Sequence, residues 1–281
     1  MCDTDALPDL KQPMPVASVV LVTGCSSGIG RAICDHLAAN GRRVFGGSRS
    51  ACAASAWTYI PIDVTQEESV AQAVAAVFAR EGRIDALVTA AGSSLMGAFE
   101  DTTIDEAKQH FDVNFFGTIR VIRAALPIMR EQRAGKIILI GSIGGVIGLQ
   151  YLSYYSAVKF ALNGLVEALR PEIAKFGVQV AVINPGDFGT NISTNELHAA
   201  NSRPHSPYFV AHQRARDLYG TRIREAPPPL AVARLVDRLL NRRTLPVRLA
   251  VGSPVEKLGL TAKRLLSPRV FEYLLQKSQG L

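Results

Sequence analysis

Short runs of apolar residues alternate along the chain with longer segments in which apolar positions recur every three or four residues. The short runs are typical of buried parallel strands, and the longer segments have the spacing of helices that pack on a sheet. We expect strands at Val16–Val22, Arg43–Ser48, Thr58–Asp63, Ile84–Thr89, Lys136–Ile140, Val178–Ile183 and Val247–Val251. We expect the main helices at Ile29–Ala39, Thr65–Arg80, Ile104–Gln132, Tyr155–Phe176 and Leu230–Leu240. This alternation predicts an α/β fold with a doubly wound, seven-stranded parallel sheet.

Prolines and irregular segments refine this prediction. Pro61 favours an edge position for the third strand, and Pro127 predicts a kink near the end of the long helix. Residues 187–229 are too long for a plain connection, and we expect a substrate-covering loop with short helices there. The predicted organisation is a flexible tail at 1–15, one domain at 16–254 and a basic amphipathic helical extension at 255–281.

Composition indicates a globular protein that functions in a reducing compartment. Of the 281 residues, 48% are hydrophobic and 20% charged, which is enough for a sizeable core. No apolar run approaches the roughly 20 residues of a membrane span, and the acidic N-terminus does not resemble a signal peptide. The four cysteines lack the spacing of a zinc site or a disulfide framework. We therefore expect a cytoplasmic protein without a bound metal.

Positive charge is concentrated in the C-terminal part. Residues 203–281 carry a balance of +10, whereas the preceding 202 residues carry −3. Such a basic segment could contact anionic membranes or acidic partners, but a solvated arginine-rich surface is the favoured interpretation. Aromatic residues are not interleaved with the basic ones as in a nucleic-acid groove, and we exclude nucleic acid as the main partner.

A glycine-rich turn, Thr23-Gly-Cys-Ser-Ser-Gly-Ile-Gly30, follows the first expected strand. Glycines allow the backbone to approach a pyrophosphate, which would rest on the amide groups and positive dipole end of the next helix. A purely structural turn is the alternative, but the valine-rich strand before it favours dinucleotide binding in a Rossmann-like fold. The expected cofactor contacts are Gly24, Ser26, Ser27, Gly28, Ile29 and Gly30.

The next two strands end in residues suited to the adenosine half of a dinucleotide. Arg49 stands where an acidic residue would accept hydrogen bonds from the ribose 2′-hydroxyl of NAD. A guanidinium instead suits a 2′-phosphate, which favours NADP over NAD, unless Arg49 is a plain surface residue. Asp63 and Val64 could hold the adenine edge, while Asp63 could equally cap the helix that follows.

Tyr155 and Lys159 stand four residues apart and therefore project from one face of the expected helix. An ammonium beside a phenol stabilises the phenolate, so the pair can exchange a proton with an alcohol or carbonyl oxygen. Ser142 ends the fifth expected strand, where ligands of such sheets bind, and can hydrogen-bond the same oxygen. The adjacent Tyr154 points away and is interpreted as packing. A second Tyr-x-x-x-Lys, at 273–277, has no strand-borne serine before it and is interpreted as the surface of an amphipathic helix.

Together these motifs resemble the short-chain dehydrogenase/reductase family over roughly residues 17–190. The resemblance implies a catalytic tetrad of Asn114, Ser142, Tyr155 and Lys159, in which Asn114 supports a proton relay and Lys159 holds the nicotinamide ribose. It also implies that Pro185, Gly186 and Thr190 flank the nicotinamide. The family's usual Asn-Asn-Ala-Gly is replaced here by Thr89-Ala90-Ala91-Gly92, and the lost amide at Ala90 predicts weaker cofactor binding.

Within that family, the chain looks like the hydroxysteroid and retinol dehydrogenase branch, which implies bulky apolar substrates. Ser142, Leu149, Tyr155 and Phe188 are the predicted substrate contacts, and further aromatic residues could join them: Tyr151, Tyr208 and Phe209. Core packing is the alternative for each lining residue. His212 could orient a polar end of the substrate or simply be exposed. The resemblance also implies a homodimer or homotetramer formed through the helices that bear Asp112 and Tyr155.

These observations predict an NADP(H)-dependent oxidoreductase that interconverts a lipophilic alcohol and its ketone or aldehyde. The alternative is a dinucleotide-sensing or scaffold protein on the same fold, which Ala90 alone favours. An activated phenol has no use in a pure binder, so the tetrad favours the enzyme.

Overall fold

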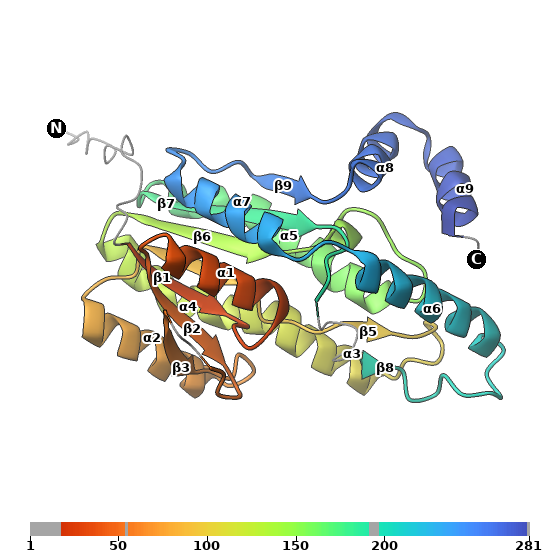
Figure 1. Ribbon diagram of the computed structural model, residues 1–281, viewed down its shortest axis with the longest axis horizontal. Helices are drawn as coiled ribbons and strands as arrows, with labels where there is room; N and C mark the ends of the chain where they lie inside the picture. Colours follow the sequence, from red (N-terminus) through yellow and green to blue (C-terminus); the bar gives the residue numbers. More distant parts are fainter. Residues whose placement is uncertain (1–17, 54–55, 191–196, 280–281) are drawn as a thin grey trace.

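A seven-stranded parallel sheet forms the centre of the computed structural model, which describes residues 18–53, 56–190 and 197–279 (Figure 1). The strand order is β3-β2-β1-β4-β6-β7-β9, and every neighbouring pair is parallel. The strands are β1 Val19–Thr23, β2 Arg43–Ser48, β3 Thr58–Pro61, β4 Ala86–Thr89, β6 Gly135–Ile140, β7 Val178–Pro185 and β9 Arg248–Val251. The predicted doubly wound sheet is confirmed, with the Pro61 strand at its edge. The predicted tail at 1–15 lies outside the described residues.

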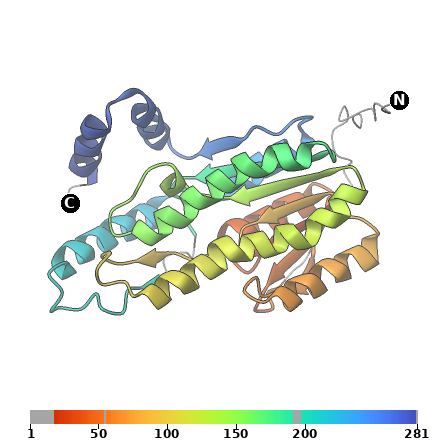
Figure 2. The ribbon, with the colours of Figure 1, turned by 180° about the vertical axis from the view of Figure 1, so that it is seen from behind.

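Helices cover both faces of the sheet, because its central strands are apolar on both sides. On one face α1 (Gly28–Ala39) and α7 (Leu230–Asn241) pack against Val20, Val22 and Ile138. On the other face α2 (Glu67–Glu81), α4 (Gly117–Glu131) and α5 (Ser153–Ala174) pack against Leu21, Leu87 and Ile137 (Figure 2). Alternate residues along each strand therefore face different helix layers.

The parallel register brings the carboxyl ends of the central strands to one edge. Thr23 pairs with Thr89 across β1 and β4, and Leu139 of β6 pairs with Val182 of β7. Segments that leave these strand ends carry the glycine turn, the Ala90 segment, Ser142 and Pro185. In open sheets of this topology, ligands bind outside these ends.

The single long helix predicted at Ile104–Gln132 is interrupted in the structure. Helix α3 (Ile104–Phe111) runs into a π-helical turn, η1 (Asp112–Phe116), before α4 begins at Gly117. Pro127 lies inside α4 without ending it. The prediction placed the irregularity at the proline, but the backbone departs from α-helical pairing around Asn114. Such π turns are frequent at functional sites.

The described part of the segment predicted as a loop with short helices contains more regular structure than expected. It contains α6 (Phe209–Glu225), a helix of 17 residues, and the short strand β8 (Leu197–His198), which pairs with β5 (Leu95–Met96). The hydrophobic pattern of this helix is weak in the sequence, because α6 exposes many charged residues and buries only the stripe formed by His212, Ala215 and Tyr219. Helix α6 lies beyond the carboxyl ends of the central strands, where ligands of such sheets bind (Figure 1).

The C-terminal extension forms two helices, α8 (Pro254–Leu265) and α9 (Pro268–Gln279), which project beyond the sheet (Figure 1). Ser253 and Glu256 cap the start of α8 reciprocally, each side chain bonding the other's backbone N–H. In the described part of the chain, no helix is both long and apolar enough to cross a membrane.

Candidate active site

The glycine-rich turn packs so closely on its surroundings that side chains have no room. Gly24 has a φ of 78°, and a Cβ there would lie 2.7 Å from the backbone of Ala90 and Ala91. A Cβ on Gly30 would lie 2.1 Å from the Gly24 carbonyl oxygen. Helix α1 starts at this turn, and its N-cap, Ser27, makes no side-chain capping bond. The first amide groups of α1 and the close backbone thus suit the pyrophosphate of a dinucleotide.

The Ala90 segment forms the second wall of this site. The amide groups of Ala90 and Ala91 both point at the hydroxyl of Thr23, each at 3.2 Å. Thr190 lies on the opposite side, since a Cβ on Gly28 would come 3.3 Å from its Cβ. The structure therefore brings together three segments that the sequence separates by up to 167 positions.

The predicted adenosine end lies at the carboxyl ends of β2 and β3. Arg49 is exposed, directly after buried Ser48. Burial would raise the pKa of the Asp63 carboxyl, but two hydrogen bonds from Thr65 bring it below its usual value, and the charge of Arg49 contributes. Asp63 therefore holds the turn before α2 through Thr65, whereas the N-cap of α2 is Gln66, so the helix cap proposed as the alternative is not formed. The Val64 side chain belongs to the core.

Ser142 and Tyr155 converge over Gly144. A Cβ on Gly144 would lie 3.1 Å from the Tyr155 ring and 3.4 Å from Ser142 Oγ. The amide groups of the short helix η2 (Ile143–Gly145) hold the serine, because the N–H of Gly144 donates to Ser142 Oγ at 3.0 Å. The side-chain oxygen of Asn184 accepts from the Ser142 backbone N–H at 3.1 Å. The Ser142 hydroxyl and the Tyr155 ring therefore lie close together at one place.

Lys159 and Asn114 meet behind this pair. A Cβ on Gly92 would lie 2.6 Å from Asn114 Oδ1 and 3.9 Å from Lys159 Nζ, so the three residues share one small space. Lys159 is buried, its Nζ donates to the Ile140 carbonyl at 3.2 Å, and it lies 5.7 Å from the centre of the Tyr155 ring. Burial lowers the pKa of Lys159 to about 8.

The π turn determines where Asn114 points. Its side-chain NH₂ donates to the His110 carbonyl at 2.9 Å, and its Oδ1 accepts from the Ser93 N–H at 3.3 Å. Asn114 is 1% exposed. The structure therefore assembles all four predicted catalytic residues from three separate elements.

The segment after β7 closes the other side of the site. Gly186 donates its N–H to the Val251 carbonyl at 2.8 Å, which continues the pairing of β7 with β9. Asp187 N–H donates to Glu256 Oε1 at 2.7 Å. A Cβ on Gly186 would lie 2.1 Å from that carboxylate, so a larger residue there would displace the Glu256 side chain. The C-terminal extension therefore contacts the predicted nicotinamide segment.

Helix α6 and the residues before α5 form an apolar cluster around Tyr155. Leu149, Tyr151 and Tyr155 pack against four buried residues: Met96, Leu152, Ala215 and Tyr219. His212 on α6 is 2% exposed, contrary to the expectation of a mostly exposed loop histidine. In the described part of the chain, neither its ring nitrogens nor the Tyr219 hydroxyl has a hydrogen-bond partner. These groups suit a polar group of a substrate.

Two predicted substrate residues are placed elsewhere. Phe188 is 5% exposed and packs with α1 and α7 in the core on the opposite face of the sheet. The Tyr208 hydroxyl donates to Glu100 Oε2 at 2.9 Å and is largely exposed. The arrangement around Leu149 and Tyr155 is the better candidate for a substrate pocket.

The comparison with known proteins agrees with this geometry. The family profile described as short chain dehydrogenase matches residues 18–201. The chain belongs to the short-chain dehydrogenase/reductase family. It is 34% identical to 3-ketodihydrosphingosine reductase from Bacteroides thetaiotaomicron over 259 residues, which cover 92% of this chain and 96% of that protein. It is 30% identical to retinol dehydrogenase 8 of Bos taurus over 257 residues, covering 82% of this chain and 80% of that protein.

Solved structures lead to the same family. A short-chain dehydrogenase from Streptomyces avermitilis superposes with a TM-score of 0.79 at 33% identity, covering 94% of this chain and 98% of that one. Short-chain dehydrogenases/reductases use NAD(P), and this chain is an oxidoreductase that acts on CH–OH groups and the corresponding carbonyl compounds.

Sequence reasoning missed three supporting residues of this short-chain dehydrogenase/reductase site. His110 is fully buried between Asn114 and Tyr155, with ring centres of His110 and Tyr155 6.2 Å apart. Asn184 exchanges hydrogen bonds with Asn163 and thereby fixes the end of β6. Spacing could have indicated His110 and Asn163, since each stands four residues from a tetrad member on a helix.

Proposed function

We propose that this protein is an NADP(H)-dependent reductase or dehydrogenase that interconverts a lipophilic alcohol and its ketone or aldehyde. The observation that carries the proposal is the convergence of Ser142, Tyr155, Lys159 and Asn114 at the carboxyl ends of the sheet strands.

The four side chains divide the proton chemistry among them. The bound nicotinamide supplies or accepts the hydride. Ser142 Oγ hydrogen-bonds the reacting oxygen, and the Tyr155 hydroxyl gives that oxygen its proton in reduction or takes it in oxidation. Lys159, whose pKa burial lowers to about 8, can hold or release a proton near neutral pH. Asn114, beside Lys159, supports the exchange of that proton with solvent.

The preference for NADP rests on Arg49. Its exposed guanidinium follows Ser48 at the end of β2, and its charge acts on Asp63 across the gap to β3. A 2′-phosphate in this position would meet a fork of donors, whereas a bare ribose would meet no acceptor from Arg49.

A lipophilic substrate follows from the lining and from the relatives. Leu149, Tyr151 and Tyr155 form an apolar cluster with Tyr219 of α6. The names of two relatives, 3-ketodihydrosphingosine reductase and retinol dehydrogenase 8, refer to long apolar molecules with one oxygen-bearing end. Ser142 and Tyr155 would hold the reacting oxygen, and His212 would orient a second polar group of the substrate.

The experiment that tests this function is a cofactor titration followed by a substrate panel. Purified protein is titrated with NADPH and NADH while nicotinamide fluorescence is followed, and ketones and aldehydes from small to steroid-sized are then added. We expect tighter binding of NADPH and its consumption by the large apolar carbonyl compounds. If the protein bound neither NADPH nor NADH, the proposal would be contradicted.

A dinucleotide sensor or scaffold is the second candidate, and Ala90 is the residue that favours it. Its methyl group replaces the amide that the family uses near the cofactor ribose. Tight NADPH binding without consumption by any carbonyl compound in the panel would favour the sensor.

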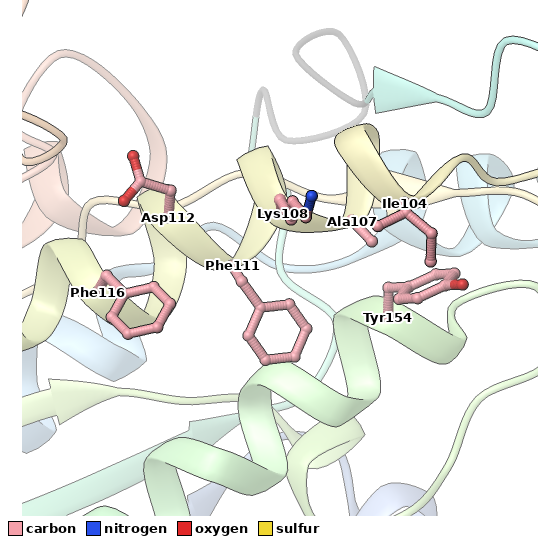
Figure 3. A pocket seen from close by; sticks show the side chains of 7 residues that line it. All are labelled: Ile104, Ala107, Lys108, Phe111, Asp112, Phe116 and Tyr154. Carbon is pink, nitrogen blue, oxygen red and sulfur yellow. The ribbon is translucent and has the colours of Figure 1, made fainter.

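The homo-oligomer is proposed to form through the helices that bear Asp112 and Tyr155, η1 with its flanking helices and α5. An apolar surface groove lies between α3, η1 and α5 and is lined by Ile104, Ala107, Lys108, Phe111, Asp112, Phe116 and Tyr154 (Figure 3). Phe116, which lines this groove, is 49% exposed, which is unusual for phenylalanine. A second copy of the chain would cover Phe116, and light scattering of Phe116→Glu against the parent protein tests this.

Peripheral contact with anionic membranes is proposed for α8 and α9. Seven large apolar residues of this extension are exposed, among them Leu258, Leu265 and Tyr273, and basic residues flank them. Apolar and basic groups on exposed amphipathic helices suit the interface of an anionic bilayer. Flotation with phosphatidylserine vesicles should weaken for Val270→Asp/Leu274→Asp, whereas equal flotation would contradict the proposal.

Three free thiols in the described chain support a reducing, cytoplasmic location.

A further inference from the structure

Two cysteines from different segments meet beneath the predicted adenosine end of the cofactor site. Cys25 lies in the glycine-rich turn, directly after Gly24, and Cys52 lies in the segment that leaves β2. Their Sγ atoms are 3.8 Å apart, and both are free thiols. None of the proposed cofactor or substrate contacts uses either sulfur.

The two thiols differ in their access to solvent. Cys25 is fully buried, and its Sγ lies 3.5 Å from the Ser48 hydroxyl. Cys52 is partly exposed, between exposed neighbours. Burial raises the pKa of Cys25 to about 11, and contact with Cys52 adds to the shift, so Cys52 is the thiol that meets an oxidant first.

We propose that Cys25 and Cys52 are an oxidisable pair that closes a reversible disulfide and thereby weakens binding of the cofactor. The Cys52 thiolate attacks a hydroperoxide, which leaves one oxygen on sulfur as a sulfenic acid and departs as an alcohol or water. The Cys25 sulfur then attacks Cys52, the S–S bond forms, and the sulfenic oxygen leaves as water. Two thiols are oxidised and one peroxide bond is reduced.

The consequence for the cofactor follows from geometry. A disulfide joins sulfurs at about 2.05 Å, so the two sulfurs must approach each other by roughly 1.8 Å through rotation of the two side chains and movement of the segments that carry them. Cys52 follows Arg49 by three residues. The Ser48 hydroxyl accepts from Cys25 Sγ at 3.5 Å and donates to the Ser50 carbonyl at 2.8 Å, so it links both segments. Closure therefore shifts the residues proposed to hold the 2′-phosphate.

The test begins with the covalent product. Fully reduced protein is treated with hydrogen peroxide, alkylated and digested, and non-reducing mass spectrometry identifies the peptides. We expect a peptide pair joined through Cys25 and Cys52 that dithiothreitol separates, and none in Cys52→Ser. Cys34→Ala is the matched control, because Cys34 is another buried thiol on α1, and it should form the same linkage as the parent. Absence of the linked pair, or oxidation of Cys52 alone to the sulfinic acid, would overturn the proposal.

The effect on the cofactor is measured on the same samples by NADPH titration. Oxidised parent protein should bind NADPH at least about fivefold more weakly than reduced protein, and peroxide-treated Cys52→Ser should bind like its untreated form. Unchanged affinity of the linked protein would overturn the coupling to the cofactor. The linkage itself forms whether or not the protein is an oxidoreductase, so failure of the proposed function is recognised separately by the reduced protein's failure to bind NADPH.

Discussion

Glu256 of α8 accepts a hydrogen bond from the backbone N–H of Asp187, 69 positions earlier, at 2.7 Å. The same carboxylate caps α8 by accepting from Ser253, and it fills the space beside Gly186. One side chain therefore joins the C-terminal extension to the segment proposed to flank the nicotinamide.

Replacing Glu256 by alanine should raise the KM for NADPH and lower the free energy of unfolding by about 1–3 kcal/mol. The physical reason is that the Asp187 N–H loses its partner in a partly buried place. Urea unfolding and steady-state kinetics measure the two effects. Ser253→Ala is the control, because it removes the helix cap and one bond to Glu256 Oε2 but leaves the Glu256 carboxylate in place to accept from Asp187, so it should leave the KM unchanged. Equal KM shifts in both variants would mean that Glu256 acts only through the helix.

Tyr155→Phe should lower kcat at least about 100-fold while NADPH binding persists, because only the proton-transferring hydroxyl is removed. Tyr273→Phe provides a matched control, since Tyr273 stands in the same Tyr-x-x-x-Lys spacing but is 63% exposed on α9. Its kcat should equal that of the parent. Full turnover in Tyr155→Phe would refute the assigned role of the phenol.

Arg49→Asp should shift the ratio of kcat/KM for NADPH over NADH towards NADH. A carboxylate repels a 2′-phosphate and accepts hydrogen bonds from a ribose hydroxyl. Arg234→Asp, an equal change of charge at an exposed position on α7, controls for net charge. If both variants alter the ratio equally, Arg49 does not contact the cofactor.

Ala90→Asn should tighten NADPH binding, by about 2- to 12-fold, because it restores an amide beside the cofactor ribose. The comparison is a fluorescence titration of the variant against the parent protein. Ala91→Asn, one position further, is the control and should not tighten binding. Weaker binding by Ala90→Asn would indicate that this chain has no space for the amide.

The stability of the protein should fall as the pH drops from 6.5 towards 4, in part because of His110. Burial, with a contribution from the charge of Lys159, lowers the pKa of His110 to about 4, so the folded protein keeps it neutral while the unfolded chain takes up a proton. The unfolded state then binds more protons, and stability decreases on acidification by up to about 3 kcal/mol from this group. Urea unfolding of His110→Gln should show a shallower decrease than the parent. Parallel curves would contradict the shifted pKa.

The sequence by itself determined the layer architecture and predicted the candidate tetrad, with Asn114 added only by the family resemblance. Strand positions followed from apolar runs, because strands buried on both faces have no polar positions to interrupt the pattern. The edge position of β3 followed from Pro61, since proline cannot donate in the sheet ladder. Ser142, Tyr155 and Lys159 were recognisable because strand ends and helix faces fix their directions.

Only the tertiary structure decided how the site is supported. Helix α6 was not predicted because its many charged residues outnumber the few that it buries. The burial of His212, which lies on α6, was missed for the same reason. The π turn at Asn114 leaves no signal in residue spacing, because it depends on how Asn114 bonds with His110 and Ser93. The contacts of Glu256 with Asp187 and of Cys25 with Cys52 join positions distant in the chain. The spacing of apolar residues shows which face of a helix or strand is buried. Contacts between residues distant in the sequence form only after the elements have packed, because the packing sets the distances between their segments.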